Sequence, residues 1–131
     1  MKILIVDDEE RTRSVFVKIM QREGFDVIEA ASAGEAYDLL LENSVDLILL
    51  DINMMNVDGT VLYEIAQVFC EKSKIIVSSV YPLEDQKKLI SGAADYYDKS
   101  DGIMVLIEKV QAAILDTRKN AIEACETRKQ A

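Results

Sequence analysis

The stretch Leu47–Gly59 reads LILLDINMMNVDG, and in it four apolar residues lead directly into Asp51. Such a short apolar run, with an Asp-Gly turn signal a few residues later, is typical of a strand buried on both faces of a parallel sheet. A carboxylate at the last position of a buried strand needs a reason. Asp51 could cap a helix, bind a metal ion or carry a covalent group.

The rest of the chain alternates strand-like and helix-like segments. Strands are expected over residues 2–6, 25–30, 45–51, 74–79 and 94–99. Helices are expected over residues 7–23, from Ser32 onward, over 60–70, between Pro82 and Gly92, and from Ile103 onward. Strands that alternate with helices predict an α/β fold, with a parallel sheet covered by helices on both faces.

Local signals mark several of the helix ends. Ser32 and Glu35 have the spacing of a capping box, and Gly24 lies just past the first helix. Pro82 stands where a helix can begin and Gly92 where one can end. The first helix is expected to bury an apolar stripe formed by Val15, Phe16, Ile19 and Met20.

Composition narrows the class of protein. The chain has 131 residues, a net charge of −9 and no histidine, which fits one acidic domain without histidine-based catalysis or most zinc sites. The charge disfavours direct nucleic-acid binding, and no apolar run is long enough to span a membrane. The N-terminus does not look like a signal peptide, so we expect a cytoplasmic protein in which Cys70 and Cys125 are free thiols.

Polar residues collect where the expected strands end. Asp7 and Asp8 follow the first strand, Asp51 ends the third, Ser78 and Ser79 end the fourth, and Lys99 ends the fifth. The carboxyl ends of parallel strands share one edge of the sheet, so the acids converge if the first and third strands are neighbours. Carboxylates 4–5 Å apart repel by roughly 3–4 kcal/mol at an effective dielectric constant near 20.

Such a cluster needs either a cation or raised pKa values of its carboxyl groups. Its ligands are all oxygen, which favours Mg²⁺ over Mn²⁺ or Ca²⁺. Lys99 and a serine hydroxyl would then face phosphate oxygens on the other side of Asp51. The residues therefore predict a phosphoryl-transfer site in which Asp51 is the nucleophile and becomes an aspartyl phosphate. A plain acid-rich helix start at residues 7–10 is the alternative reading.

This layout resembles the response-regulator receiver domain over residues 2–116. The matching features are the acidic pair after the first strand, the LLD motif with Gly59 eight residues after Asp51, the hydroxyl ending the fourth strand, and GAADYYDK before residue 100. The resemblance implies a doubly wound, flavodoxin-like, five-stranded sheet of order 2-1-3-4-5 with five helices. Residues 117–131 would be a polar extension of the last helix or a tail.

The resemblance also implies the roles of the acids. Asp51 would receive a phosphoryl group from a phosphohistidine on a sensor histidine kinase or phosphotransfer protein. Asp8 would bind Mg²⁺ directly, Asp7 through a water molecule, and Asn53 through its backbone carbonyl, with Asp51 as a further ligand. The domain would be a switch with at most weak self-dephosphorylation, rather than an enzyme.

Three further residues are given roles by the resemblance. Lys99 would pair with the phosphoryl group, Ser79 would move to hydrogen-bond it, and Tyr96 would swing inward behind that serine. Ser78 is the alternative for the serine role, because the two serines are adjacent. The surface of the last two helices and the strand between them would then change its preference for a downstream protein target.

The sequence departs from the family pattern in places. Met55 stands where proline is common, and Ser100 replaces the proline that usually follows the lysine. The stretch from Ser79 to Lys99 is about two residues short, which leaves homodimer formation on that surface open. Val80 stands where the family has a small residue, so it would crowd the phosphoryl group and hinder water. Asn53 could act in the opposite direction by holding a water molecule in line, which leaves the sign of the net effect open.

Other functions compete with the switch. An aspartate-based phosphohydrolase usually has a second carboxylate two residues after the nucleophile, and Asn53 occupies that position. A cofactor-binding module of flavodoxin or cobalamin type would need a glycine-rich phosphate loop or a histidine ligand, and neither is present. A degenerate receiver that binds partners without phosphorylation is disfavoured by the complete set of acids and Lys99.

Overall fold

The computed structural model describes residues 1–52, 63, 73–90 and 92–130, and for Leu89 and residues 117–130 it describes only the backbone. Its centre is a single sheet in which all strand pairs are parallel. The spatial order is β2-β1-β3-β4-β5, as predicted. The strands are β1 Lys2–Val6, β2 Asp26–Ala30, β3 Leu47–Asp51, β4 Lys74–Ser79 and β5 Asp95–Asp98.

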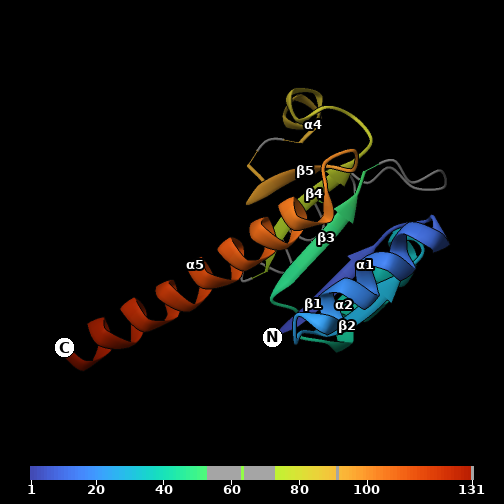
Figure 1. Ribbon diagram of the computed structural model, residues 1–131. Coiled ribbons are helices and arrows are strands. Elements are labelled where there is room, and N and C mark those ends of the chain that lie inside the picture. Colours follow the sequence, from blue (N-terminus) through green and yellow to red (C-terminus); the bar gives the residue numbers. More distant parts are fainter. Residues whose placement is uncertain (53–62, 64–72, 91, 131) are drawn as a thin grey trace.

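Four helices are described around this sheet (Figure 1). They are α1 Glu10–Arg22, α2 Ala33–Glu42, α4 Leu83–Leu89 and α5 Ile103–Gln130. The helix expected over residues 60–70 lies outside the described residues apart from Tyr63, which is helical. Helix α5 continues well past the sheet, so residues 117–130 belong to the same helix (Figure 1). No helix among the described residues has the length and apolar character needed to cross a bilayer.

The strand β3 is central, and all five of its residues are buried. Alternate side chains along it serve two separate cores. Ile48 and Leu50 join the core under α2, whereas Leu47 and Leu49 join the core under α1 and α5. Burying one leucine side chain contributes about 2 kcal/mol, so the two-sided core fixes both the position and the register of β3.

The predicted helix signals are confirmed, with one exception among the core residues. Ser32 caps α2 by accepting a hydrogen bond from the backbone of Glu35, and Gly24 and Gly92 have positive φ angles of 91° and 87°. Phe16 and Met20 are buried as expected. The prediction for Val15 is wrong: its side chain is 48 % exposed, because it lies to one side of the buried stripe formed by Phe16 and Met20.

Candidate functional site

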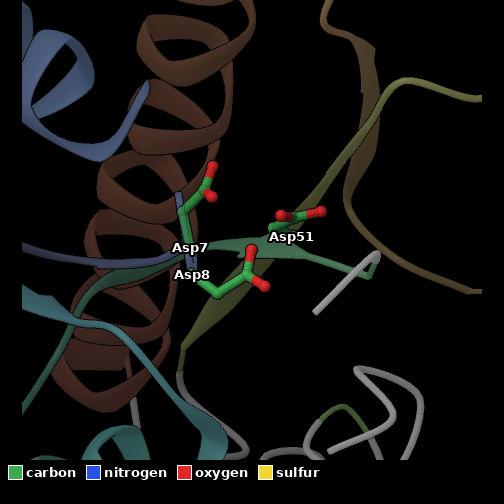
Figure 2. Close-up of side chains that lie close together, drawn as sticks. All are labelled: Asp7, Asp8 and Asp51. Atoms are coloured by element: carbon green, nitrogen blue, oxygen red, sulfur yellow. The ribbon is translucent and has the colours of Figure 1, made fainter. Parts of the chain in front are cut away.

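The strand register brings the three acids to one edge of the sheet. Val6 pairs with Leu50, so Asp7 and Asp51 continue neighbouring strands at the same level. Asp8 follows directly, and ligand oxygens of Asp7, Asp8 and Asp51 all lie within 4.8 Å of one another. Figure 2 shows the three carboxylates grouped at the ends of β1 and β3. The predicted convergence of these acids is therefore present.

Two of these acids are buried and need a compensating charge. Asp7 is 2 % exposed and Asp51 is 3 % exposed, whereas Asp8 is exposed. The ammonium of Lys99 lies 2.9 Å from Asp7 Oδ2 and 3.2 Å from Asp51 Oδ2. The backbone N–H of Lys99 donates to the Ser79 carbonyl at 2.8 Å, which fixes the lysine at the end of β5. Three strands thus contribute to one charge cluster.

The environment of Lys99 favours its charged form. Burial alone would lower the pKa of Lys99, because a charge loses solvation in the interior. The hydrogen bond to Asp7 and the negative charges of Asp51 and Asp7 outweigh burial, and the pKa of Lys99 lies above its usual value. The lysine therefore remains a cation throughout the neutral pH range.

Arg13 is a site residue that the sequence analysis missed. Its Nη1 donates to the backbone carbonyl of Asp7 at 2.8 Å, and its Nε pairs with Glu29 Oε1 at 3.0 Å. Long helical side chains point back toward the helix N-terminus, which brings Arg13 over the end of β1. Its position six residues after Asp7, inside a helix, was the signal available in the sequence.

The two serines at the end of β4 lie on opposite faces of the sheet. Ser78 pairs in register with Asp51 and, by alternation, shares the face of Ile76 and Tyr97. Its buried Oγ has no hydrogen-bond partner among the described residues. Ser79 shares the face of Tyr96, and its Oγ accepts a hydrogen bond from the backbone N–H of Tyr81 at 3.1 Å.

Tyr96 already points inward in this structure. Its side chain is 8 % exposed, and its hydroxyl donates to the Ile90 carbonyl at 2.7 Å and accepts from the Ala93 N–H at 3.3 Å. Tyr97 points to the other face, where its ring contacts Phe16 edge-on. The two tyrosines therefore lie on opposite faces of the sheet, and both are buried.

A cleft of about 500 Å³ has Lys99 in its wall. Its walls come from the start of α1, the residue after β4 and the loop between β5 and α5, and they include Arg11, Val15, Val80, Lys99 and Ile103. Val80 is 66 % exposed. An apolar side chain thus stands at the opening that leads to the lysine. Asn53, Met55, Asp58 and Gly59 lie outside the described residues.

The arrangement combines three chemical elements. The carboxylates offer hard oxygen ligands, which fit Mg²⁺ and do not suit softer metals. Asp51 offers a nucleophilic oxygen at the end of a rigid central strand, and Lys99 supplies a cation next to it. These are the elements needed to hold a phosphoryl group on a carboxylate. The fold and the site together define a class of phosphoacceptor domain.

Comparison with known families assigns this class. The family model for the response regulator receiver domain matches residues 3–111. The chain belongs to the response regulator receiver domain family, whose members act as signalling switches. Its resemblance to that family, first seen in the motifs, is confirmed.

Individual relatives agree with this assignment. The transcriptional regulatory protein SrrA of Staphylococcus aureus is 30 % identical over 129 residues, which is 95 % of this chain and 52 % of SrrA. The chain thus spans about half the length of that relative. A CheY-like receiver domain protein from Methanospirillum hungatei has a TM-score of 0.84 and 29 % identity, covering 91 % of this chain and 97 % of that one.

A further similar structure contains Mg²⁺-BeF. The response regulator TrrA of Thermotoga maritima, in complex with Mg²⁺-BeF, has a TM-score of 0.78 and 28 % identity. The match covers 86 % of this chain and 97 % of TrrA.

Proposed function

We propose that Asp51 is the phosphoacceptor of this receiver domain. The observation that carries the proposal is the position of its carboxylate, which is 3 % exposed, 3.2 Å from the Lys99 ammonium and clustered with Asp7 and Asp8. A carboxylate oxygen of Asp51 attacks the phosphorus of a phosphohistidine on a sensor kinase or phosphotransfer protein. The new O–P bond forms as the N–P bond breaks, and the leaving imidazole takes a proton from solvent.

The other residues stabilise the transferred group. We propose that Asp8 and Asp51 hold Mg²⁺ directly, Asp7 through a water molecule, and Asn53 through its backbone carbonyl. The bound cation offsets negative charge on the phosphoryl oxygens and on the acids. Lys99 leaves its contact with Asp51 and pairs with a phosphoryl oxygen, while it remains near Asp7.

We propose Ser79 as the switch hydroxyl. Its support is that Ser79 lies on the same face of the sheet as Tyr96, whose side chain already points inward. Ser78 is the competing residue, because it is the register partner of Asp51 and its buried hydroxyl has no hydrogen-bond partner in the part of the chain that the structure describes. Comparison of Ser78→Ala and Ser79→Ala decides between them: the switch variant accepts the phosphoryl group but loses the conformational response.

The donor protein is proposed to dock over the cleft beside Lys99. Val15 and Val80 present apolar side chains at this opening, and a macromolecular donor must bring its phosphohistidine to it. The surface of α4, β5 and α5 is proposed to contact the downstream target. Three features stay predictions: a domain limit at residue 116, formation of a homodimer and a cytoplasmic location.

Incubation with acetyl phosphate and Mg²⁺, followed by intact-mass measurement, tests the function. We expect the mass of one phosphoryl group on the wild type and on Asp38→Asn, an exposed carboxylate of α2, and none on Asp51→Asn. An adduct that persists in Asp51→Asn overturns the assignment. Rapid multiple turnover of a small phosphate ester without an adduct would indicate a phosphohydrolase, and no reaction would indicate a degenerate receiver.

A further inference from the structure

Helix α4 contains a fully buried glutamine. Gln86 is 0 % exposed, although Asp85 and Lys87 on either side of it are exposed. Its Nε2 donates to the backbone carbonyl of Tyr81 at 2.8 Å and to that of Tyr97 at 2.9 Å. The side chain of Gln86 therefore ties α4 both to the segment that follows β4 and to β5.

The tie continues to the proposed switch hydroxyl. The Oγ of Ser79 accepts a hydrogen bond from the backbone N–H of Tyr81, and the carbonyl of the same residue accepts from Gln86. Tyr81 is thus held on one side by the serine and on the other by the glutamine. A change in the hydrogen bonding of Ser79 reaches α4 through a single residue.

A second tie holds the other end of α4. The Tyr96 hydroxyl donates to the carbonyl of Ile90, the C-cap residue of this helix. This contact does not involve Ser79 or Tyr81. When the first tie changes and the second does not, α4 turns about its C-terminal end instead of shifting as a whole.

The arrangement at Gln86 is not fully satisfied. Its Oε1 is buried and has no hydrogen-bond partner among the described residues. A buried acceptor without a partner raises the free energy of the state that contains it. A rearrangement of α4 that gave this oxygen a donor would offset part of that cost.

We propose that Gln86 is the positioning residue that couples the acceptor site to helix α4. This inference rests on the proposed function of Asp51 and Ser79. When the Ser79 hydroxyl turns to a phosphoryl oxygen on Asp51, the Tyr81 N–H loses its acceptor and residues 80–82 move. Gln86 follows because it holds the Tyr81 carbonyl, and α4 turns about Ile90.

The wild-type protein provides the first test, by NMR with Mg²⁺ and beryllofluoride as the phosphoryl mimic. We expect the amide of Tyr81 to lose protection from hydrogen exchange by about tenfold or more, and the side-chain amide signals of Gln86 to shift. The amide of Ile90 should change least along α4. Unchanged signals of Tyr81 and Gln86, while the amides of α4 respond, would overturn the proposal.

Variants supply the second test. Gln86→Met keeps the length of the side chain but removes both hydrogen bonds, and Lys88→Met places the same side chain on the exposed face of α4. We expect Gln86→Met to form the Asp51 adduct at a rate within about twofold of the wild-type rate. The same variant should lose most of the change in the α4 amide signals that Mg²⁺ and beryllofluoride cause. Lys88→Met should keep both the rate of adduct formation and the change in these signals.

The two proposals fail in different ways. An adduct together with a full α4 response in Gln86→Met overturns the coupling role and leaves the acceptor role intact. Absence of an adduct and of beryllofluoride binding in the wild type overturns the acceptor role, and the coupling role falls with it.

Discussion

The Lys99 ammonium lies 2.9 Å from Asp7 Oδ2, although the two residues are 92 positions apart in the chain. The contact joins the end of β5 to the end of β1 across the two strands between them. The lysine also reaches Asp51, so one cation is shared by two buried carboxylates. This sharing links stability, metal binding and phosphoryl transfer.

Lys99 should make stability depend on alkaline pH. The pKa of Lys99 is raised above its usual value of 10.5, so the stability that this lysine contributes is complete below pH 10.5 and is lost as the pH rises through the folded-state pKa. Burial also raises the pKa of Tyr97, which adds a separate alkaline loss. The difference in the free energy of unfolding between the wild type and Lys99→Met, measured by urea titration, should stay constant up to pH 10.5 and shrink only above it.

At neutral pH, the free energy of unfolding of Lys99→Met should be about 2 kcal/mol lower than that of the wild type, because two buried carboxylates lose a charged hydrogen-bond donor. The same variant should bind Mg²⁺ severalfold more tightly than the wild type, since a cation next to the site is removed. Isothermal titration measures this affinity. Weaker Mg²⁺ binding by Lys99→Met would contradict the idea that lysine and metal compete for the same carboxylates.

Mg²⁺ should stabilise the domain through Asp8. At a concentration ten times the dissociation constant, binding adds about 1.4 kcal/mol to the free energy of unfolding. Thermal melts should therefore shift upward by about 4 °C with the metal. Asp8→Asn should lose most of this shift, whereas Asp38→Asn, which removes the same charge from an exposed position of α2, should retain it.

Arg13 should matter for the acids without touching the phosphoryl group. Arg13→Ala removes a charged hydrogen bond to the Asp7 carbonyl and the ion pair with Glu29, so we expect a loss of about 1–2 kcal/mol in stability. Because Arg13 holds the backbone that carries the acids and, unlike Lys99, does not pair with their carboxylates, we expect its loss to weaken Mg²⁺ binding severalfold. Arg13→Lys should retain only part of the wild-type stability and Mg²⁺ affinity, because an ammonium cannot make both contacts with the same planar geometry. Lys18→Ala, an exposed position of α1, should change neither quantity.

Val80 should control how long the phosphoryl group survives. The side chain lines the cleft that leads to Lys99, so Val80→Ala should admit water more freely and shorten the lifetime of the adduct by about two- to tenfold. Intact mass followed over time after removal of acetyl phosphate gives this lifetime. Val15→Ala trims another wall of the cleft and serves as the control, since Val15 lies on α1 whereas Val80 directly follows β4. An unchanged lifetime in Val80→Ala would show that the valine does not shield the phosphoryl group.

The sequence by itself determined the fold class and the acids of the site. The buried run before Asp51, the period of the apolar residues and the turn residues act over a few neighbouring positions, so they can be read without coordinates. The family motifs add the strand order, since they occur in a fixed sequence along the chain. The acidic pair Asp7-Asp8 and Lys99 were found in the same way, at the ends of strands.

Only the tertiary structure decided how these residues share their contacts. Three sets of contacts join segments that are distant in sequence or lie on different elements. Lys99 pairs with two carboxylates, Arg13 donates to the Asp7 carbonyl, and Gln86 makes two hydrogen bonds. The exposure of Val15 likewise depends on where the sheet ends beneath α1. Local patterns do not encode these contacts, because each depends on how separate elements are oriented once their apolar faces are packed.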